Sequence, residues 1–248
     1  MTSARLNVFA SPRPAALCAT LLLSGVLGSL PGLAHAQFRE GAADTMAERM
    51  LACAACHGKE GRATRDGYFP RIAGKPAGYL YNQLLNFRDG HRRYPQMSYM
   101  VAHLSDAYLK EMADYFSSLE LPYAPAQRAA VPTEVFERGR KLALNGDPAR
   151  KIPACTACHS EKLTGMQPTI PGLLGLSRDY LNAQFGAWRL GRRKAAAPDC
   201  MAEISRKLTP EDIGAVSAWL SSQPVPADMK ARPPAASKLP LRCGSFPQ

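Results

Sequence analysis

Apolar residues recur at three- and four-residue spacing in two related stretches of the chain, Tyr79–Phe87 and Tyr180–Trp188. This spacing places the apolar side chains on one face of an α-helix, and Gly90 and Gly191 suit the ends of two such helices. We therefore predict one helix in the middle of each half of the chain.

Further helices are predicted on both sides of these two. Ser105 and Thr209 are favourable N-caps for a last helix in each half, and Pro210 suits the first helical position after Thr209. Helical segments are also expected over Ala42–Leu51 and Thr133–Leu144. Because no alternating stretch of useful length indicates a strand, we predict an all-α protein.

The two halves are copies of one pattern. After residue 70 the same residue types recur 101 positions later, and from Met97 onward, which matches Met201, the offset is 104. The residues matched at the first offset are Pro70, Gly74, Tyr79, Leu80, Gln83, Gly90 and Arg92 with Pro171, Gly175, Tyr180, Leu181, Gln184, Gly191 and Arg193. Such self-similarity indicates an internal duplication.

The repeat and the prolines set the expected domain boundaries. One domain is predicted over residues 37–120 and a second over 133–223, joined by a proline-containing linker at 121–132, where prolines forbid a continuous helix. Residues 224–248 form a Pro-rich tail. Taken alone, a tail of this composition is expected to be loose.

Residues 1–36 have the composition of a cleaved export signal. Arg5 and Arg13 precede an apolar stretch over Ala15–Leu30, and the small-residue sequence Ala34–Ala36 follows. An apolar run of about 16 residues is shorter than the roughly 20 that a membrane-spanning helix needs. The sequence therefore predicts an exported, periplasmic protein.

Two short segments carry the chemistry of the chain, because each reads Cys-x-x-Cys-His. This is the attachment signature of c-type haem, in which both cysteines form thioethers and the histidine ligates the iron. A Cys-x-x-Cys pair alone is also compatible with a redox dithiol or half of a zinc site. The predicted haem residues are Cys53, Cys56 and His57 in the first half and Cys155, Cys158 and His159 in the second. We expect two covalently bound haem c groups.

The second axial ligand of each iron is predicted from the repeat. Met97 and Met201 occupy equivalent positions, and outside its haem motif the second half has no histidine. Met100 is expected to be packing, Met166 has no counterpart, and His103 is expected at the surface. A methionine beside a helix is ordinarily core filler, but repetition in two haem modules favours ligation.

Two cysteines remain after the haem motifs and the signal are set aside. Cys18 lies in the export signal, which leaves Cys200 and Cys243 in the mature chain. An even number of cysteines in an exported protein favours their pairing. We predict a disulfide that pins the tail beside Met201.

The formal charge is +11, and removal of the predicted signal leaves 29 Lys and Arg against 20 Asp and Glu, a charge of +9. The basic residues are spread along the chain instead of being massed with aromatics, so a nucleic-acid partner is not expected. Two clusters, 91–93 and 189–194, precede the predicted methionine ligands. They are candidates for pairing with haem propionates, for docking an acidic partner, or for a solvated positive face.

These motifs together resemble the dihaem cytochrome c4 family over nearly the whole mature chain. The resemblance implies two tandem class I cytochrome c domains related by a pseudo-twofold axis, in periplasmic carriers that are often membrane-associated. It also implies that the carbonyls of Pro70 and Pro171 accept hydrogen bonds from Nδ1 of the proximal histidines. One departure is Ser160, which stands where the first half has Gly58.

The expected function is transfer of single electrons between redox proteins, with no catalysis by the chain itself. The resemblance implies a donor such as a quinol–cytochrome c reductase or a dehydrogenase, and a haem-copper oxidase as acceptor. One alternative is the dihaem subunit of a dehydrogenase complex of the flavocytochrome c type. Another is a dihaem peroxidase, which needs an open or displaceable iron ligand that the paired methionines argue against.

Overall fold

The computed structural model describes residues 44–126, 129–234 and 239–246. The predicted export segment and Cys18 therefore lie outside the described residues. The described residues belong to one compact unit that runs from Ala42 to Gln248. In this part of the chain, no helix has the length and apolar character needed to cross a membrane.

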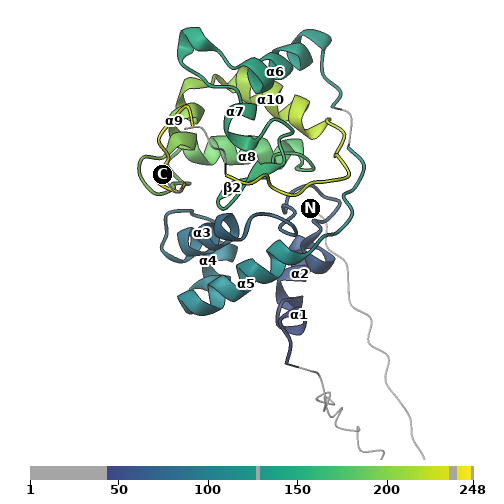
Figure 1. Cartoon of the computed structure of the whole chain (residues 1–248), viewed down its shortest axis with the longest axis vertical. Coiled ribbons are helices and arrows are strands. Elements are labelled where there is room, and N and C mark those ends of the chain that lie inside the picture. Colours follow the sequence, from purple (N-terminus) through teal and green to yellow (C-terminus); the bar gives the residue numbers. More distant parts are fainter. Residues whose placement is uncertain (1–43, 127–128, 235–238, 247–248) are drawn as a thin grey trace, which may run out of the picture. The chain divides into compact units, whose positions relative to one another are not determined.

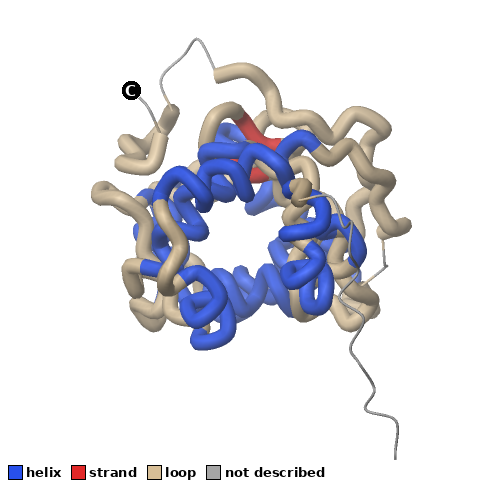
Figure 2. The backbone as a smooth tube through the Cα atoms, turned by 90° about the horizontal axis from the view of Figure 1, so that it is seen from below, coloured by secondary structure: helices blue, strands red, loops and turns tan. Residues whose placement is uncertain are grey.

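The structure is mostly helical, as predicted (Figure 1). The first half contains α1 (Met46–Arg49), α2 (Leu51–His57), the 3₁₀ turn η1 (Lys59–Gly61), α3 (Ala77–Arg88), α4 (Pro95–Val101) and α5 (Asp106–Ser118). The second half contains α6 (Thr133–Asn145), the 3₁₀ turn η2 (Pro148–Arg150), α7 (Thr156–His159), α8 (Arg178–Arg189), α9 (Cys200–Lys207) and α10 (Pro210–Ser221). In Figure 2 the blue helices are the main regular elements, tan loops connect them, and the strands form only a short red segment.

The predicted helix starts are confirmed by their caps. The Ser105 hydroxyl accepts a hydrogen bond from the Tyr108 N–H at the start of α5. At the start of α10, Thr209 and Asp212 form a reciprocal capping box. The first predicted helical segment differs, because the structure divides it at Met50 into the short helices α1 and α2.

The only strands among the described residues are two residues long. β1 (Gly165–Met166) pairs antiparallel with β2 (Ile170–Pro171). The tail joins this hairpin, since the Arg232 N–H donates to the Gly165 carbonyl at 3.0 Å and the Arg232 carbonyl accepts from the Gln167 N–H at 2.8 Å. These short strands agree with the prediction that the chain has no long strand. The tail, which its composition alone indicated to be loose, is hydrogen-bonded to the hairpin through Arg232.

Each half has its own hydrophobic cluster. The first cluster consists of Met50, Leu80, Phe87, Val101, Leu109, Met112, Ala113 and Phe116. The second consists of Leu142, Ala143, Ile152, Leu163, Leu174, Leu181, Phe185, Leu208, Ile213, Val216, Trp219 and Leu220. The apolar faces of the last helices, α5 and α10, are buried in these clusters.

Helices α6 and α10 approach closely in the second half. A Cβ atom added at Gly139 on α6 would lie 2.1 Å from the Ala215 carbonyl oxygen of α10. Any side chain at this position would force the two helices apart, so the glycine permits the contact. This pair of helices forms one wall of the second cluster.

The predicted linker at 121–132 contains no helix in its described residues. Its start is fixed by the buried Arg71 guanidinium, which donates to the carbonyls of Leu121 at 2.5 Å and Pro122 at 2.9 Å. The same guanidinium lies 3.8 Å from the ring centroid of Tyr123. The exact domain boundaries stay a prediction.

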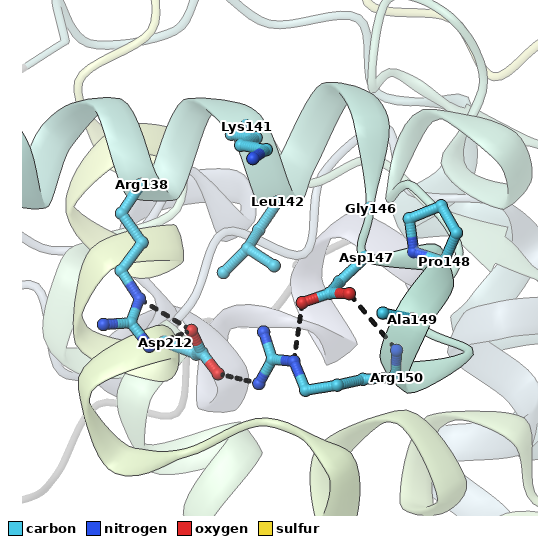
Figure 3. A pocket seen from close by; sticks show the side chains of 9 residues that line it. All are labelled: Arg138, Lys141, Leu142, Gly146, Asp147, Pro148, Ala149, Arg150 and Asp212. Carbon is cyan, nitrogen blue, oxygen red and sulfur yellow. Dashed lines mark hydrogen bonds and ion pairs between the residues drawn. The ribbon is translucent and has the colours of Figure 1, made fainter.

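A network of charged side chains closes the end of the second half (Figure 3). It borders a cavity of about 370 Å³ lined by residues that include Arg138, Lys141, Asp147, Arg150 and Asp212. The fully buried carboxylate of Asp212 accepts from Arg138 Nε at 2.8 Å and Arg150 Nη1 at 2.6 Å. These contacts connect the start of α10 to α6 and η2.

Candidate haem-binding sites

The first Cys-x-x-Cys-His motif lies on α2, which ends at the buried His57. The Nδ1 atom of His57 lies 2.9 Å from the carbonyl oxygen of Pro70. Because a carbonyl can only accept, Nδ1 carries the proton in this contact, and Nε2 keeps its lone pair. A neutral imidazole oriented in this way is suited to ligate a metal through Nε2.

The second motif repeats this geometry. Cys155 is the N-cap of α7, which ends at the buried His159. The Nδ1 atom of His159 lies 2.7 Å from the carbonyl oxygen of Pro171, a residue of β2. The structure therefore contains both histidine–proline contacts that the family resemblance implied.

The ionisation of these side chains favours ligation over dithiol chemistry. Burial lowers the pKa of both His57 and His159, which keeps the imidazoles neutral. Burial raises the pKa of Cys155 to about 12 and also raises the pKa of Cys53. A redox dithiol requires an accessible thiolate, which the buried environments of Cys53 and Cys155 disfavour.

Each predicted methionine ligand packs against the same hydrophobic cluster as one cysteine of the motif in its own half. Met97 on α4 and Cys53 both contact the first cluster, whereas Met201 on α9 and Cys155 both contact the second. The structure thus brings one cysteine of each motif and the expected methionine to the same side-chain cluster. It also places Cys53 and Cys155 on separate clusters.

The three other residues considered as axial ligands lie in different environments. His103 is exposed, as expected. Met166 is buried in β1. The prediction that Met100 is a packing residue is wrong, because its side chain is 46% exposed. The inward positions of this segment are Met97 and Val101, four residues apart, and Met100 lies at the edge of the face that they share.

Gly58 and Ser160 occupy equivalent positions after the two haem motifs and share one backbone conformation although their residue types differ. Gly58 has φ 74° and ψ 165°, and Ser160 has φ 69° and ψ 157°, a region that non-glycine residues rarely adopt. The Ser160 hydroxyl accepts a hydrogen bond from the Thr164 N–H at 3.1 Å. This contact helps to hold the strained turn that follows the second motif.

Cys200 and Cys243 form a disulfide with their Cα atoms 5.4 Å apart. Cys200 is the first residue of α9 and precedes Met201 directly. The Gly244 N–H adds a hydrogen bond to the Pro198 carbonyl at 3.0 Å. The end of the tail is therefore tied to the segment that carries Met201.

The two basic clusters meet each other at the contact between the halves. The backbones of Arg92 and Arg193 pair in an isolated antiparallel β-bridge. It is flanked by hydrogen bonds from the Arg93 N–H to the Arg192 carbonyl at 2.7 Å and from the Lys194 N–H to the His91 carbonyl at 2.9 Å. Since 91 and 192 are equivalent in the repeat, as are 93 and 194, these two bonds are reciprocal, as a pseudo-twofold relation requires.

Side-chain hydrogen bonds between the two halves are reciprocal in the same way. Arg92 donates to Gln184 Oε1 at 2.6 Å and to the Tyr180 hydroxyl at 3.1 Å. Arg193 donates to Gln83 Oε1 at 3.0 Å and to the Tyr79 hydroxyl at 3.3 Å. Arg193 is only 6% exposed. This residue therefore does not belong to a solvated positive face, and that interpretation of the basic clusters is wrong for Arg193.

This network fits two haem groups. None of the ion pairs found in the described residues supplies a carboxylate to Arg92 or Arg193. Two neighbouring guanidinium groups without a counter-ion are costly to bury. Each haem carries propionate carboxylates, which are the anions that such a pair would accept.

This network could be predicted from the sequence only in part. The tyrosine, glutamine and arginine pairs are visible as repeated positions, but the sequence indicated a role only for the basic clusters. Polar residues that recur far from the attachment motif were the available signal. Lys75 donates a hydrogen bond to the Gly172 carbonyl of the second half at 2.9 Å. This contact had no such signal, because the residue equivalent to Lys75 is Leu176.

Two haem-attachment motifs with buried, oriented histidines, repeated in one mostly helical unit, define a dihaem c-type cytochrome. No family model matches the chain. A thiosulfate dehydrogenase electron acceptor from Stutzerimonas stutzeri is 38% identical over 84% of this chain and 94% of its own length. A cytochrome c4 from Pseudomonas aeruginosa is 34% identical over 82% of this chain and 96% of its own length.

A solved structure gives the same result. The crystal structure of reduced recombinant cytochrome c4 from Pseudomonas stutzeri is 29% identical, with a TM-score of 0.59 over 71% of this chain and 95% of that one. The chain belongs to the dihaem cytochrome c4 family, which includes the thiosulfate dehydrogenase electron acceptors. It is a dihaem c-type electron carrier without catalytic activity of its own, and its partners are redox proteins.

Proposed function

We propose that this protein accepts electrons one at a time from a thiosulfate dehydrogenase in the periplasm and delivers them to a terminal oxidase. The observation that carries the choice of donor is the 38% identity to a thiosulfate dehydrogenase electron acceptor over 94% of that protein. A second relative with the same description, from Thiomonas intermedia, supports it.

The residues proposed to hold the two cofactors are those of the duplicated sites. Cys53 and Cys56 would form the thioethers of the first haem, with His57 and Met97 as axial ligands. In the second half, the thioethers would come from Cys155 and Cys158, with His159 and Met201 as axial ligands. A haem c bound in this way supplies one-electron chemistry through its iron.

The protein contributes orientation and charge. The carbonyls of Pro70 and Pro171 fix the two imidazole rings through Nδ1 and leave Nε2 directed away from the hydrogen bond. Helices α4 and α9 supply the methionines from packed, short elements, which limits their freedom to leave the iron. Rigid ligands suit electron transfer, because little reorganisation accompanies each change of charge.

The contact between the halves supports transfer within the molecule. Gln83 Oε1 accepts from both Arg92 and Arg193, and Gln184 Oε1 also accepts from both. Burial raises the pKa of Tyr180, but the charges of Arg92 and Arg193 outweigh burial and lower it. This strongly positive, hydrogen-bonded region would neutralise carboxylates from both haems and hold the two groups in a fixed relation.

The proposed donor is tested by mixing the oxidised holoprotein with a catalytic amount of purified thiosulfate dehydrogenase and excess thiosulfate. We expect both haems to become reduced, with none reduced when either the dehydrogenase or thiosulfate is omitted. Failure of reduction, in a preparation that ascorbate or dithionite reduces fully, would reject this donor.

The proposed acceptor and location need separate measurements. Oxidation of the reduced protein by membranes that contain a haem-copper oxidase, with sensitivity to cyanide, tests the delivery step. Recovery of the mature chain beginning near Gln37 in the periplasmic fraction tests export. Release of the protein from membranes by salt tests peripheral association, which the positive charge favours.

Stable association with the dehydrogenase is the competing form of the same function. The chain would then be a subunit and not a free carrier. Co-purification in a fixed ratio through gel filtration at 0.3 M salt would favour the subunit, and separate elution would favour the carrier.

A further inference from the structure

One buried lysine of the first half reaches into the second haem site. Lys75 lies between Gly74 and Pro76, before the start of α3, and only 4% of its surface is exposed. Its ammonium donates a hydrogen bond to the carbonyl oxygen of Gly172, in the second half, at 2.9 Å. The contact therefore joins the segment before α3 to the loop that follows β2.

This loop also orients the second proximal histidine. Gly172 follows Pro171, whose carbonyl accepts the hydrogen bond from His159 Nδ1 at 2.7 Å. Burial is the main cause that lowers the pKa of His159, and the positive charge of Lys75 lowers it further. For His57 the corresponding cation is Arg92 and not Lys75. The electrostatic influence of Lys75 is thus directed at the second site.

No carboxylate offsets this charge in the part of the chain that the structure describes, since none of its ion pairs includes Lys75. The charged neighbour is instead the Arg71 guanidinium, which has the same sign. Burial, with a smaller contribution from Arg71, lowers the pKa of Lys75 to about 7. Among the described residues, no ion pair compensates the cost of burying this cation.

The two proposed haem sites differ here, because the two halves carry different residues at the position of Lys75. Leu176 occupies the position equivalent to Lys75, and an aliphatic side chain cannot donate to the loop after Pro70. In the reverse direction, the second half contacts the first through the Ser177 hydroxyl, which donates to the Gly67 carbonyl. That contact is neutral, so between these two equivalent segments the described contacts give a full positive charge to the second site alone. The contacts of Arg92 and Arg193 run in both directions and do not distinguish the two sites.

We propose that Lys75 is a positioning residue of the first half that raises the reduction potential of the haem in the second half. Its ammonium holds the Pro171–Gly172 loop in place and adds a positive charge near His159. A nearby positive charge disfavours the ferric state more than the ferrous state, because the ferric iron carries one more positive charge. Electrons are thereby directed toward the second haem. The proposal rests on the haem ligands assigned under the proposed function.

The test is a spectroelectrochemical titration of the holoprotein at pH 6, below the pKa of Lys75. Lys75→Gln removes the charge and keeps a hydrogen-bond donor, Lys75→Met removes both, and Lys75→Arg keeps the charge. The matched control is Lys110→Gln, which removes an equal charge from an exposed position on α5. The transition of the second haem is identified as the one that shifts in Met201→Ala.

We expect the reduction equilibrium constant of the second haem to fall roughly tenfold in Lys75→Gln and Lys75→Met, the effect of one unit charge over about 10 Å at an effective dielectric constant of about 20. Tenfold corresponds to 59 mV for a one-electron couple. The first haem should change less than threefold. Lys75→Arg should retain most of the wild-type potential, and Lys110→Gln should leave both potentials unchanged.

A second-haem shift below threefold in both Lys75→Gln and Lys75→Met would overturn the proposal, as would equal shifts of the two haems. If Lys75→Met fails to fold, Lys75→Gln and Lys75→Arg still separate charge from structure. Wild-type spectra separate this outcome from failure of the proposed function. A protein without methionine-ligated haem would lack the ferric sulfur-to-iron band before any variant is compared.

Discussion

Replacement of Asp212 by asparagine removes the negative charge from the network at the start of α10 while keeping the size of the side chain. The wild-type carboxylate is fully buried and accepts from Arg138, from Arg150 and from the Thr209 N–H at 3.0 Å. Burial alone would raise the pKa of Asp212, but these hydrogen bonds outweigh burial and lower it from 3.8 to about 2. The native contacts therefore favour the ionised form.

The expected loss of stability can be worked out from this pKa shift. A difference of about 1.8 pKa units, at 1.36 kcal/mol per unit, corresponds to about 2.5 kcal/mol. Removing one partner of a fully buried ion pair costs about 3–5 kcal/mol. The Arg138 and Arg150 side chains are 48% and 36% exposed, so water can solvate them in the variant. We therefore expect a loss near the lower value, about 2.5 kcal/mol at pH 7.

The pH dependence has a definite sign. Because the folded pKa is depressed, the stabilisation is present above the unfolded value of 3.8 and is lost as the pH falls through about 2. The difference in free energy of unfolding between wild type and Asp212→Asn should be constant from pH 7 to about pH 5. It should shrink between pH 4 and pH 2.

Guanidinium chloride unfolding of the holoprotein is a suitable assay. Trp188 and Trp219, the two tryptophans of the chain, both lie in the second half, so their fluorescence reports on the domain that contains Asp212. The matched control is Asp114→Asn, whose partner Lys110 is exposed, and it should cost less than about 1 kcal/mol. A loss below about 1 kcal/mol for Asp212→Asn, or a loss that persists unchanged at pH 2, would refute the reasoning.

The other predictions concern the haem sites and the tail. Met97→Ala and Met201→Ala should each remove the ferric sulfur-to-iron band of one haem and lower its potential, because methionine ligation favours ferrous iron, and optical redox titration checks both. Loss of the band from both haems in one variant would contradict the assignment. Cys243→Ser should lower the free energy of unfolding by up to about 4 kcal/mol, because the bridge spans 43 residues, and calorimetry of the oxidised variant measures it. The rate of reduction by the dehydrogenase should fall steeply with ionic strength if the basic surface docks an acidic partner, and a salt-independent rate would contradict such docking.

Helices α3, α5, α8 and α10 could be predicted because their signals are local. Ser105 and Thr209 mark the starts of α5 and α10 through side-chain hydrogen bonds to nearby N–H groups, and the apolar spacing of α3 and α8 defines one buried face. The break at Met50 was missed, since nothing in the residue types around it interrupts a helix.

The haem motifs were equally accessible, because two cysteines and a histidine act within a single helical turn. The contacts between halves were harder to predict, since they depend on how two separate helical sets pack. Met100 illustrates this, because its exposure follows from the orientation of α4 and not from its residue type. Lys75 had no sequence signal at all, and its burial is set by the loop of the opposite half.

The central claim, that the chain holds two haems with histidine and methionine ligands for one-electron transfer, is tested most directly by an optical redox titration of the purified holoprotein. The account predicts two one-electron transitions, a ferric sulfur-to-iron band from both haems, and no turnover of peroxide. A high-spin ferric haem, or peroxidase activity, would contradict it.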